Sequence, residues 1–351
     1  MYKVRYKIVS FIFAYLFMLC STFTAYGDIS IYFLDVGQGD ATIIVCDGEA
    51  MIIDGGDRVY SRFIYSYLTN TLNLDHLKYV ISTHPHADHA GGLAAALNVG
   101  AVEAVFSPVT YYDDPGFGAL RKQMMVHNMP FTMPLPGNTM QLGQAEVIFL
   151  APDRLTANMN DNSIIVKIAY GATSFLFLAD AEQEEEQALL ASGLDITADV
   201  LKVGHHGSDT STSDTFLSAV NPQCAVISCG KNNTYGHPAQ SVLFKLSQIG
   251  ATVYRTDQNG TILCRSDGTT LTWKTEKDSH TFVSYAAETI AHDRAEQADF
   301  EHGYIGNKSS HKLHYPDCVG VMNMKEENKV VFTSREDAIS LGYSSCQICN
   351  P

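Results

Sequence analysis

The stretch that decides the fold is Thr83-His84-Pro85-His86-Ala87-Asp88-His89, which directly follows the apolar, strand-like run 77–82. Three imidazoles and one carboxylate therefore lie within six residues. On a helix, His84 and His86 would point in different directions. On a loop that leaves a strand end, these two side chains can converge on one ion while the aspartate and the last histidine turn to a second ion. Imidazole and carboxylate together suit Zn²⁺, Mn²⁺ or Fe, and a chance histidine-rich loop is the less favoured interpretation.

Other ionisable residues stand at the ends of further β-rich runs. A rigid sheet can aim side chains at its strand ends into one shared cleft. Each residue taken alone would more often be structural, but together they make a bridged two-metal site the economical explanation. The residues are Asp54 in Ile53-Asp54-Gly55-Gly56, Asp180 after the run 175–179, His205 and His206 in Gly204-His205-His206-Gly207-Ser208, and His237 in Tyr235-Gly236-His237-Pro238.

Short β-rich runs alternate with helical stretches from Asp28 to Lys274. Strands that alternate with helices, over a length too great for one simple sheet, predict a layered α/β sandwich. The predicted strands are 29–34, 41–46, 51–53, 77–82, 163–170, 173–178, 199–203, 224–228, 252–255, 260–264 and 270–273, and the predicted helices are 58–71, 181–191 and 241–249.

The composition excludes several classes of protein. Apolar residues make up 46% of the 351 residues and charged residues 17%, which supports a packed core and excludes a disordered chain. The formal net charge of −15 excludes a large basic face for nucleic acid as the default interpretation. It does not exclude a phosphate substrate, because two divalent cations would reverse the local field.

The N-terminus predicts export. Lys3, Arg5 and Lys7 precede the thirteen-residue apolar run 8–20, and small residues then lead to Gly27. This order is that of a secretory signal peptide, residues 1–27, with cleavage after Gly27. An uncut membrane anchor is the alternative, disfavoured because a spanning helix needs ~20 apolar residues. We therefore expect a secreted protein with no stable membrane insertion after cleavage.

The motifs in this order resemble the metallo-β-lactamase fold, and more closely its ComEC-type branch, named for the hydrolase-like domain of the competence DNA-uptake protein. The resemblance covers roughly residues 29–274. It implies an αββα sandwich with the metals at one edge, here a hydrolase domain over residues 28–274. The matching stretches are His84 to His89, Asp54-Gly55-Gly56, Phe33 to Asp40, Asn162-Ser163, Gly204 to Ser208 and Tyr235 to Pro238.

The resemblance also implies a role for each site residue. One of two divalent ions, Zn or Mn, would be held by His84 and His86, and the other by Asp88 and His89. Asp180 would bridge the two ions. Further acidic and amide side chains, Asp40, Asp54 and Asn162, are expected to orient the groups that bind metal.

One histidine of the family pattern is missing before the bridging aspartate, because that neighbourhood reads Asn160-Asp161-Asn162-Ser163. We expect His206, or less favourably His205, to replace it at the first metal. His237 would then complete the second metal. The histidine of the pair that does not bind metal, taken as His205, could contact the substrate phosphate.

The expected chemistry is hydrolysis without a serine or cysteine nucleophile. Two bound metals lower the pKa of a bridging water and supply hydroxide at neutral pH, and Asp88 or Asp180 can hold that water and receive its proton. The favoured substrate is a phosphodiester, which makes the protein an exported phosphodiesterase or nuclease acting on DNA or RNA. The alternatives are a cell-wall esterase for phosphocholine or teichoic-acid phosphodiesters, a lactonase, and a non-catalytic binding protein whose metals are structural.

Three aromatic residues lie in the loop predicted over 107–118, namely Tyr111, Tyr112 and Phe117. They could line the substrate cleft or equally pack against the sandwich.

The end of the chain contains a second candidate metal site. After an acidic linker over 275–303, the segment 304–351 contains His314-x3-Cys318 and Cys346-x2-Cys349. These four side chains, His314, Cys318, Cys346 and Cys349, fit a closed tetrahedral site for one structural Zn. One disulfide with a free thiol is the alternative, but zinc is favoured because so short a segment has little core.

This last segment resembles the zinc-binding module of the Ada DNA-repair protein, which transfers methyl groups from phosphates to a zinc-bound cysteine. The matching position here is His314, so the resemblance implies a stabilising or nucleic-acid-docking role in a small α+β module. The stretches that match are Tyr304 to Asn307, His314 to Cys318, Ser334 to Ala338, Gly342-Tyr343 and Cys346-x2-Cys349.

Overall fold

The structure is a computed structural model that describes residues 27–277, 283–286, 304–314, 321, 324–332 and 335–346. The predicted signal peptide lies outside these ranges except for Gly27, as do Cys318 and Cys349. Within the described ranges, no helix has both the length and the apolar character needed to cross a membrane.

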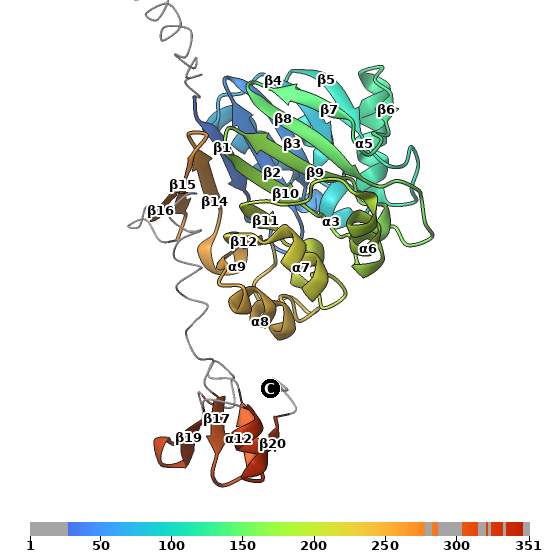
Figure 1. Cartoon of the computed structure of the whole chain (residues 1–351). Coiled ribbons are helices and arrows are strands. Elements are labelled where there is room, and N and C mark those ends of the chain that lie inside the picture. Colours follow the sequence, from blue (N-terminus) through green and yellow to red (C-terminus); the bar gives the residue numbers. More distant parts are fainter. Residues whose placement is uncertain are drawn as a thin grey trace, which may run out of the picture.

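Two facing β-sheets with helices on their outer sides form an αββα sandwich, as predicted (Figure 1). The strand order is β16-β15-β14-β1-β2-β3-β4-β5-β6 in the first sheet and β13-β12-β11-β10-β9-β8-β7 in the second. The strands of the first sheet are β1 (Ile29–Phe33), β2 (Ala41–Cys46), β3 (Glu49–Gly55), β4 (His76–Ile81), β5 (Ala101–Phe106), β6 (Phe131–Thr132), β14 (Ile262–Ser266), β15 (Thr270–Thr275) and β16 (Val283–Ala286). Those of the second are β7 (Thr139–Leu142), β8 (Ala145–Ala151), β9 (Ile165–Tyr170), β10 (Thr173–Phe177), β11 (Val200–Lys202), β12 (Cys224–Ile227) and β13 (Thr252–Arg255).

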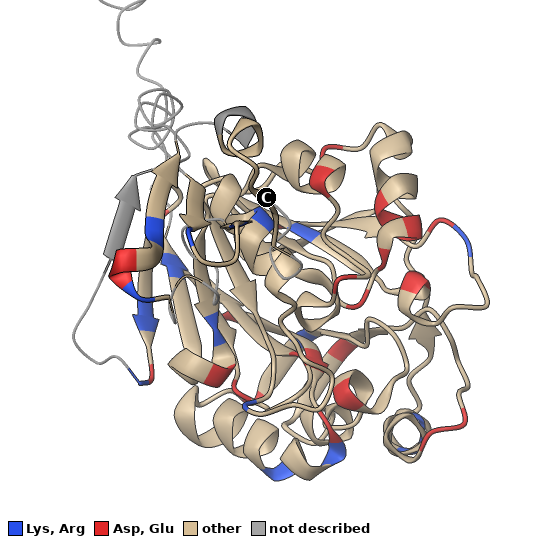
Figure 2. Cartoon of the chain, turned by 90° about the horizontal axis from the view of Figure 1, so that it is seen from below, with Lys and Arg blue, Asp and Glu red and all other residues tan. Residues whose placement is uncertain are grey.

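The helices follow from the same chain order. They are α2 (Ser61–Ser66), which continues into a π-helical turn (Tyr67–Thr71), α3 (Ala87–Ala90), α4 (Leu93–Ala96), α5 (Pro115–Val126), α6 (Gln183–Ser192), α7 (Asp214–Val220), α8 (Gln240–Gln248) and α9 (Thr256–Asn259). Short 3-10 turns lie at Arg58–Tyr60, Asn160–Asn162 and Gly204–Gly207. Asp and Glu occur on many loops and helices of the sandwich, whereas Lys and Arg are fewer (Figure 2).

Side-chain alternation explains the central core. Strand β1 buries Ile29, Ile31 and Phe33 while Ser30 and Tyr32 are only half-buried, because successive residues of a strand point to opposite faces. The buried set packs against residues of the second sheet, and Phe33 stacks on Phe177 at 6.1 Å between ring centroids. Burying one such side chain contributes about 1.5–3 kcal/mol. The two sheets are therefore joined by an apolar layer that holds their strand ends in register.

The middle of the sandwich, between α4 and β9, was left without predicted elements, and one residue in it was placed wrongly. Phe117 lies in α5 rather than in a loop, and it is fully buried in the core on the outer side of the first sheet. The carboxylate of Asp114 accepts hydrogen bonds from the backbone N–H groups of Gly116 and Phe117, and Pro115 is the first helical residue. Asp followed by Pro is a helix start, so the sequence did contain the indication.

The predicted linker also contains regular structure. Strand β16 lies within residues 275–303 and pairs antiparallel with β15, with Thr270 opposite Ala286. The sheet therefore extends beyond residue 274, the predicted end of the hydrolase domain.

The described parts of residues 304–346 form a separate four-stranded sheet of order β19-β17-β18-β20. Its elements are β17 (Tyr304–Asn307), β18 (Lys312–His314), β19 (Lys329–Phe332), β20 (Ser344–Ser345), a 3-10 turn (Glu326–Asn328) and α12 (Arg335–Ser340). Because β18 and β20 are parallel, and the Cys346 N–H donates to the Leu313 carbonyl at 2.9 Å, His314 and Cys346 leave the sheet at the same edge. Both residues are buried.

A buried carboxyl outside the metal centre gives a prediction about stability and pH. Glu185 on α6 is 2% exposed and lines a cavity of about 230 Å³. Burial, followed by the charges of Asp153 and Asp161, raises its pKa from 4.5 to about 7. A carboxyl with a raised folded-state pKa stabilises the fold below the unfolded pKa, and that contribution is lost as pH rises through about 7. Wild-type stability should therefore fall by on the order of 1–3 kcal/mol between pH 4.5 and 8.

The Glu185→Gln variant should lose this part of the pH dependence and unfold at higher urea than wild type at pH 8. Urea unfolding at pH 5 and pH 8 measures the difference. Glu184→Gln on the same helix, whose side chain is 68% exposed, is the matched control. Equal pH slopes for wild type and Glu185→Gln would contradict the assignment.

Candidate metal centre

The site lies at one edge of the sandwich, where the chain leaves strands of both sheets. His84 and His86 follow β4 on extended backbone, and α3 begins immediately after His86. Because the helix starts there, Asp88 and His89 turn away from the two preceding histidines. From the second sheet, Asp180 follows β10, the pair His205 and His206 follows β11 in the 3-10 turn, and His237 follows β12.

The first group that could hold a metal ion contains His84, His86 and Asp180, whose ligand atoms lie within 4.8 Å of one another. His84 Nε2 lies 3.1 Å from His86 Nδ1 and 3.7 Å from Asp180 Oδ2. His84 is fully buried, whereas His86 is partly open to the cleft.

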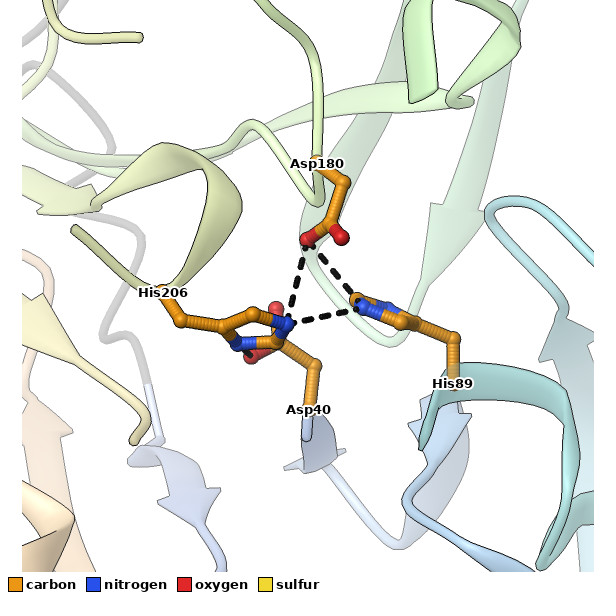
Figure 3. A group of neighbouring side chains, drawn as sticks. All are labelled: Asp40, His89, Asp180 and His206. Atoms are coloured by element: carbon orange, nitrogen blue, oxygen red, sulfur yellow. Dashed lines mark hydrogen bonds and ion pairs between the residues drawn. The ribbon is translucent and has the colours of Figure 1, made fainter. Parts of the chain in front are cut away.

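The second group contains Asp40, His89, Asp180 and His206 (Figure 3). Asp180 Oδ1 lies 3.1 Å from His89 Nε2 and 3.5 Å from His206 Nε2. Asp88 belongs beside this group, because its Oδ2 lies 3.2 Å from the same His206 nitrogen. The two oxygens of Asp180 thus face different groups, which is the placement that a bridging carboxylate requires.

The ligand imidazoles are held from behind. Asp54 Oδ2 lies 2.8 Å from His89 Nδ1, and it also accepts a hydrogen bond from the Thr83 hydroxyl at 2.6 Å. His206 Nδ1 donates to the Ser228 carbonyl at 3.1 Å. Since each ring uses Nδ1 for these contacts, each presents Nε2 to the site, which fixes the ring orientation that a metal ligand needs.

Asp40 lies behind His206 and is paired with a buried lysine. Asp40 Oδ1 is 3.3 Å from His206 Nδ1, and its Oδ2 is 2.7 Å from Lys202 Nζ. The Lys202 ammonium also donates to the Val203 carbonyl at 3.1 Å. Asp40 therefore contacts the ring nitrogen that points away from Asp180, as expected of a residue that orients His206.

Three predicted positions differ from the structure. His206 lies with His89 and Asp88, not with His84 and His86, because the turn that carries it enters from the side of β12. His205 is on the first side instead, with Nε2 3.8 Å from Asp180 Oδ2. His237 lies outside both groups on the cleft wall.

Asn162 does not reach the metal groups either. Its side chain accepts from the Thr156 N–H at 2.6 Å and donates to the Thr156 carbonyl at 3.1 Å. It therefore braces the loop 156–162, because a short amide side chain satisfies nearby backbone groups. The neighbouring Asn160 lines the cleft in its place and donates to Glu182 Oε1 at 2.9 Å.

The charges of the site show how the donor set fits two divalent cations. Four carboxylates, Asp40, Asp54, Asp88 and Asp180, converge with only one lysine, Lys202, among the residues that the structure describes. Asp180 Oδ1 is buried and has no hydrogen-bond partner within the described part of the chain. A buried carboxylate oxygen without a partner is costly, and a bound cation would remove that cost. The mixed imidazole and carboxylate donors suit Zn²⁺ or Mn²⁺.

The pKa shifts in the site follow the same imbalance. Burial opposes charge on Asp88, but His89 and His206 outweigh it and lower the pKa of Asp88 to about 2. Burial likewise opposes charge on His206, but Asp180, Asp40 and Asp88 raise its pKa to about 10. For His84, burial and then the charge of His89 lower the pKa. The carboxylates are thus ionised at neutral pH and available as ligands.

A cleft of about 310 Å³ opens over the two groups. Its walls are Gln38, His86, Ala87, Asp88, Asn160, Asp180, His205, His206, Tyr235 and His237. Of the three aromatic residues considered for this role, Tyr112 contacts the edge of His86 at 5.9 Å, Tyr111 is exposed beside Arg121, and Phe117 is in the core. The aromatic side chain that borders the cleft is Tyr235.

Sequence reasoning missed Lys202, Asn160, Gln38 and Tyr235 as site residues. Lys202 could have been noticed, because a lysine inside the otherwise apolar run 200–203, one turn before the His205-His206 pair, is unusual for a buried strand. Asn160, Gln38 and Tyr235 are ordinary loop residues whose importance depends on the tertiary arrangement.

The sequence profile of the metallo-beta-lactamase superfamily matches residues 34–231. The chain belongs to this superfamily. The matched range contains every residue of both metal groups, whereas His237 lies beyond it. The superfamily assignment agrees with the αββα sandwich and with a cation-binding cleft at the strand ends.

Two curated relatives of this superfamily member have names connected with DNA uptake or competence. ComE operon protein 3 of Bacillus subtilis is 31% identical over 251 residues, which cover 66% of this chain and 32% of that protein. Competence protein ComA of Neisseria gonorrhoeae is 26% identical over 230 residues, 65% of this chain and 31% of that protein. The chain spans about a third of the length of these relatives. Among solved structures, the metallo-beta-lactamase fold protein YhfI of Bacillus subtilis aligns with 12% identity and a TM-score of 0.46, over 68% of this chain and 100% of that one.

Proposed function

We propose that the chain is an exported, metal-dependent phosphodiesterase that acts on nucleic acid. The observation that carries the proposal is that two histidine and carboxylate groups share Asp180 at the floor of an open cleft. A structural metal site is closed by protein ligands, whereas a catalytic site keeps a position open. The competence-related names of the relatives favour nucleic acid as the substrate.

The cations, when bound, would lower the pKa of a water molecule and polarise a phosphoryl oxygen. The residues of the chain supply the rest. The Asp88 side chain is 34% exposed and faces the cleft, so its carboxylate can accept a proton from an attacking water. His205 is 21% exposed, and its Nδ1 is held by Thr210 at 3.0 Å, which leaves Nε2 to contact a phosphate oxygen.

Hydrolysis of bis-(p-nitrophenyl) phosphate tests this proposal. With Zn²⁺ or Mn²⁺ added, the His86→Ala and Asp88→Ala variants should each lose at least about 100-fold in kcat/KM, because each removes a predicted ligand. The exposed His127→Ala variant is the control and should keep wild-type activity. Full activity in either site variant, with a wild-type melting temperature, would refute the site.

The same assay separates the alternative functions. Hydrolysis of phosphocholine esters or lactones in preference to plasmid DNA, RNA and the nitrophenyl ester would favour the cell-wall esterase or the lactonase. Metal binding without turnover of any of these substrates would favour a non-catalytic binding protein.

For residues 304–351 we propose a small module that one structural zinc stabilises, with His314, Cys318, Cys346 and Cys349 as ligands. The support is that His314 and Cys346 leave parallel neighbouring strands at one edge and are both buried. The burial of His314 lowers its pKa, which favours the neutral imidazole that a metal needs. The other two ligands lie outside the described residues.

A further inference from the structure

We infer that Tyr235 and His237 form a subsite on which one nucleobase of a single-stranded substrate stacks beside the metal centre. This inference rests on the proposed function and assigns its specificity. It starts from the rim of the cleft, where both rings lie.

The two rings form a short aromatic column that leads outward from the metal groups. Tyr235 is 71% exposed, and its ring stacks on His237 with centroids 5.7 Å apart and planes 24° apart. The His237 ring in turn lies 6.3 Å from the ring of the metal candidate His206, at 28°. A base that stacks on the open face of Tyr235 would therefore place its neighbouring phosphodiester toward the cleft.

The loop that carries this pair is fixed before any substrate binds. Asn233 accepts hydrogen bonds from the N–H groups of Tyr235 (3.2 Å) and His237 (3.0 Å). Its amide nitrogen donates to the carbonyls of Gly230 (2.9 Å) and His237 (2.6 Å). Gly230 N–H is bound in turn by the Gln38 side chain at 3.0 Å. Because the loop is already ordered, the binding of a base costs little further conformational entropy.

Electrostatics explain why stacking is needed. No Lys or Arg belongs to the described residues that line the cleft, and the chain carries a net charge of −15. A nucleic acid therefore gains little from a basic groove, which is the usual source of affinity. An aromatic platform can supply binding energy for any base. Bases in a duplex are already stacked inside the helix, so the platform selects single strands or frayed ends.

The test compares two substrates of equal length and charge. One is a single-stranded oligothymidylate, and the other is an oligonucleotide of abasic tetrahydrofuran residues. The measured quantity is the ratio of their kcat/KM values with Mn²⁺. Tyr235→Ala should lower this ratio by roughly 5- to 100-fold, the range found for removal of one aromatic stacking partner. Tyr235→Phe, which keeps a stacking face, and Tyr65→Ala, which removes a partly exposed tyrosine on α2, should keep the ratio.

An unchanged ratio in Tyr235→Ala would overturn the stacking subsite, because the bases would then make no productive contact with this ring. Cleavage of neither oligonucleotide by wild type would instead overturn the proposed function. Fluorescence anisotropy with labelled oligonucleotides decides the subsite in that case: weaker binding of oligothymidylate alone in Tyr235→Ala supports it, and equal binding by wild type and variant rejects it.

Discussion

Replacing Asp180 with alanine should remove both cations from the cleft and lower kcat/KM by about 1,000-fold or more, equivalent to about 4 kcal/mol. No other residue belongs to both metal groups, among those described. Its two oxygens face His84 on one side and His89 and His206 on the other. Loss of this carboxylate therefore weakens both groups at once, whereas His86→Ala removes a ligand from only one.

Metal content measured by mass spectrometry checks this expectation. Wild type should bind three ions per chain, two in the cleft and one in the C-terminal module, and Asp180→Ala should keep only the last. The Cys346→Ser change in that background should remove the remaining zinc. Asp75→Ala, which removes an exposed aspartate elsewhere, is the control for charge. An Asp180→Ala protein that retains two cleft ions would show that the groups do not share this ligand.

Replacing Lys202 with methionine should lower the free energy of unfolding by about 3–5 kcal/mol, because it leaves the buried Asp40 carboxylate without its cation. Lys202 and Asp40 are 2% and 4% exposed, and their charged atoms lie 2.7 Å apart. Burial alone would raise the pKa of Asp40, but Lys202 and His206 hold it below its usual range. The charge pair therefore persists at neutral pH, and the loss of one partner is costly.

Urea unfolding measures this effect, and a second variant separates charge from packing. The double variant Asp40→Asn/Lys202→Met removes both charges and should recover part of the lost stability. Lys78→Met breaks a partly exposed pair with Glu49 at 2.6 Å and should cost within about 1 kcal/mol. Equal losses in Lys202→Met and Lys78→Met would contradict a strong buried pair.

The sequence was sufficient for the fold class because the motif 83–89 and the β-rich runs around it have a short-range pattern. Strand alternation and the clustering of ligand types are both visible in neighbouring letters. The elements between residues 101 and 151 were missed, because their apolar residues show no periodicity that favours helix or strand. The capping pair Asp114-Pro115 was the one available indication of α5.

Part of the site was beyond reach of the sequence for a physical reason. Which side of Asp180 a histidine occupies depends on the direction in which its loop enters, not on residue type. His205 and His206 are adjacent in sequence, yet both adopt the left-handed backbone conformation, with φ of 48° and 54°. This unusual turn sends one ring into the buried second group and leaves the other on the cleft wall. The same limit explains why Asn162 was expected in the site and its neighbour Asn160 was not.

The arrangement of ligands across the two sheets has a consequence for the order of folding. His89 comes from the first sheet, whereas Asp180 and His206 come from the second, so the cation sites do not exist until the apolar layer between the sheets has formed. Cation binding is then a late event that follows the rate-limiting assembly. Interactions that form after the transition state slow unfolding and leave the folding rate nearly unchanged. In an exported protein that is exposed to proteases, the metals would thus act as a lock on the finished sandwich, prolonging its lifetime without hastening its formation.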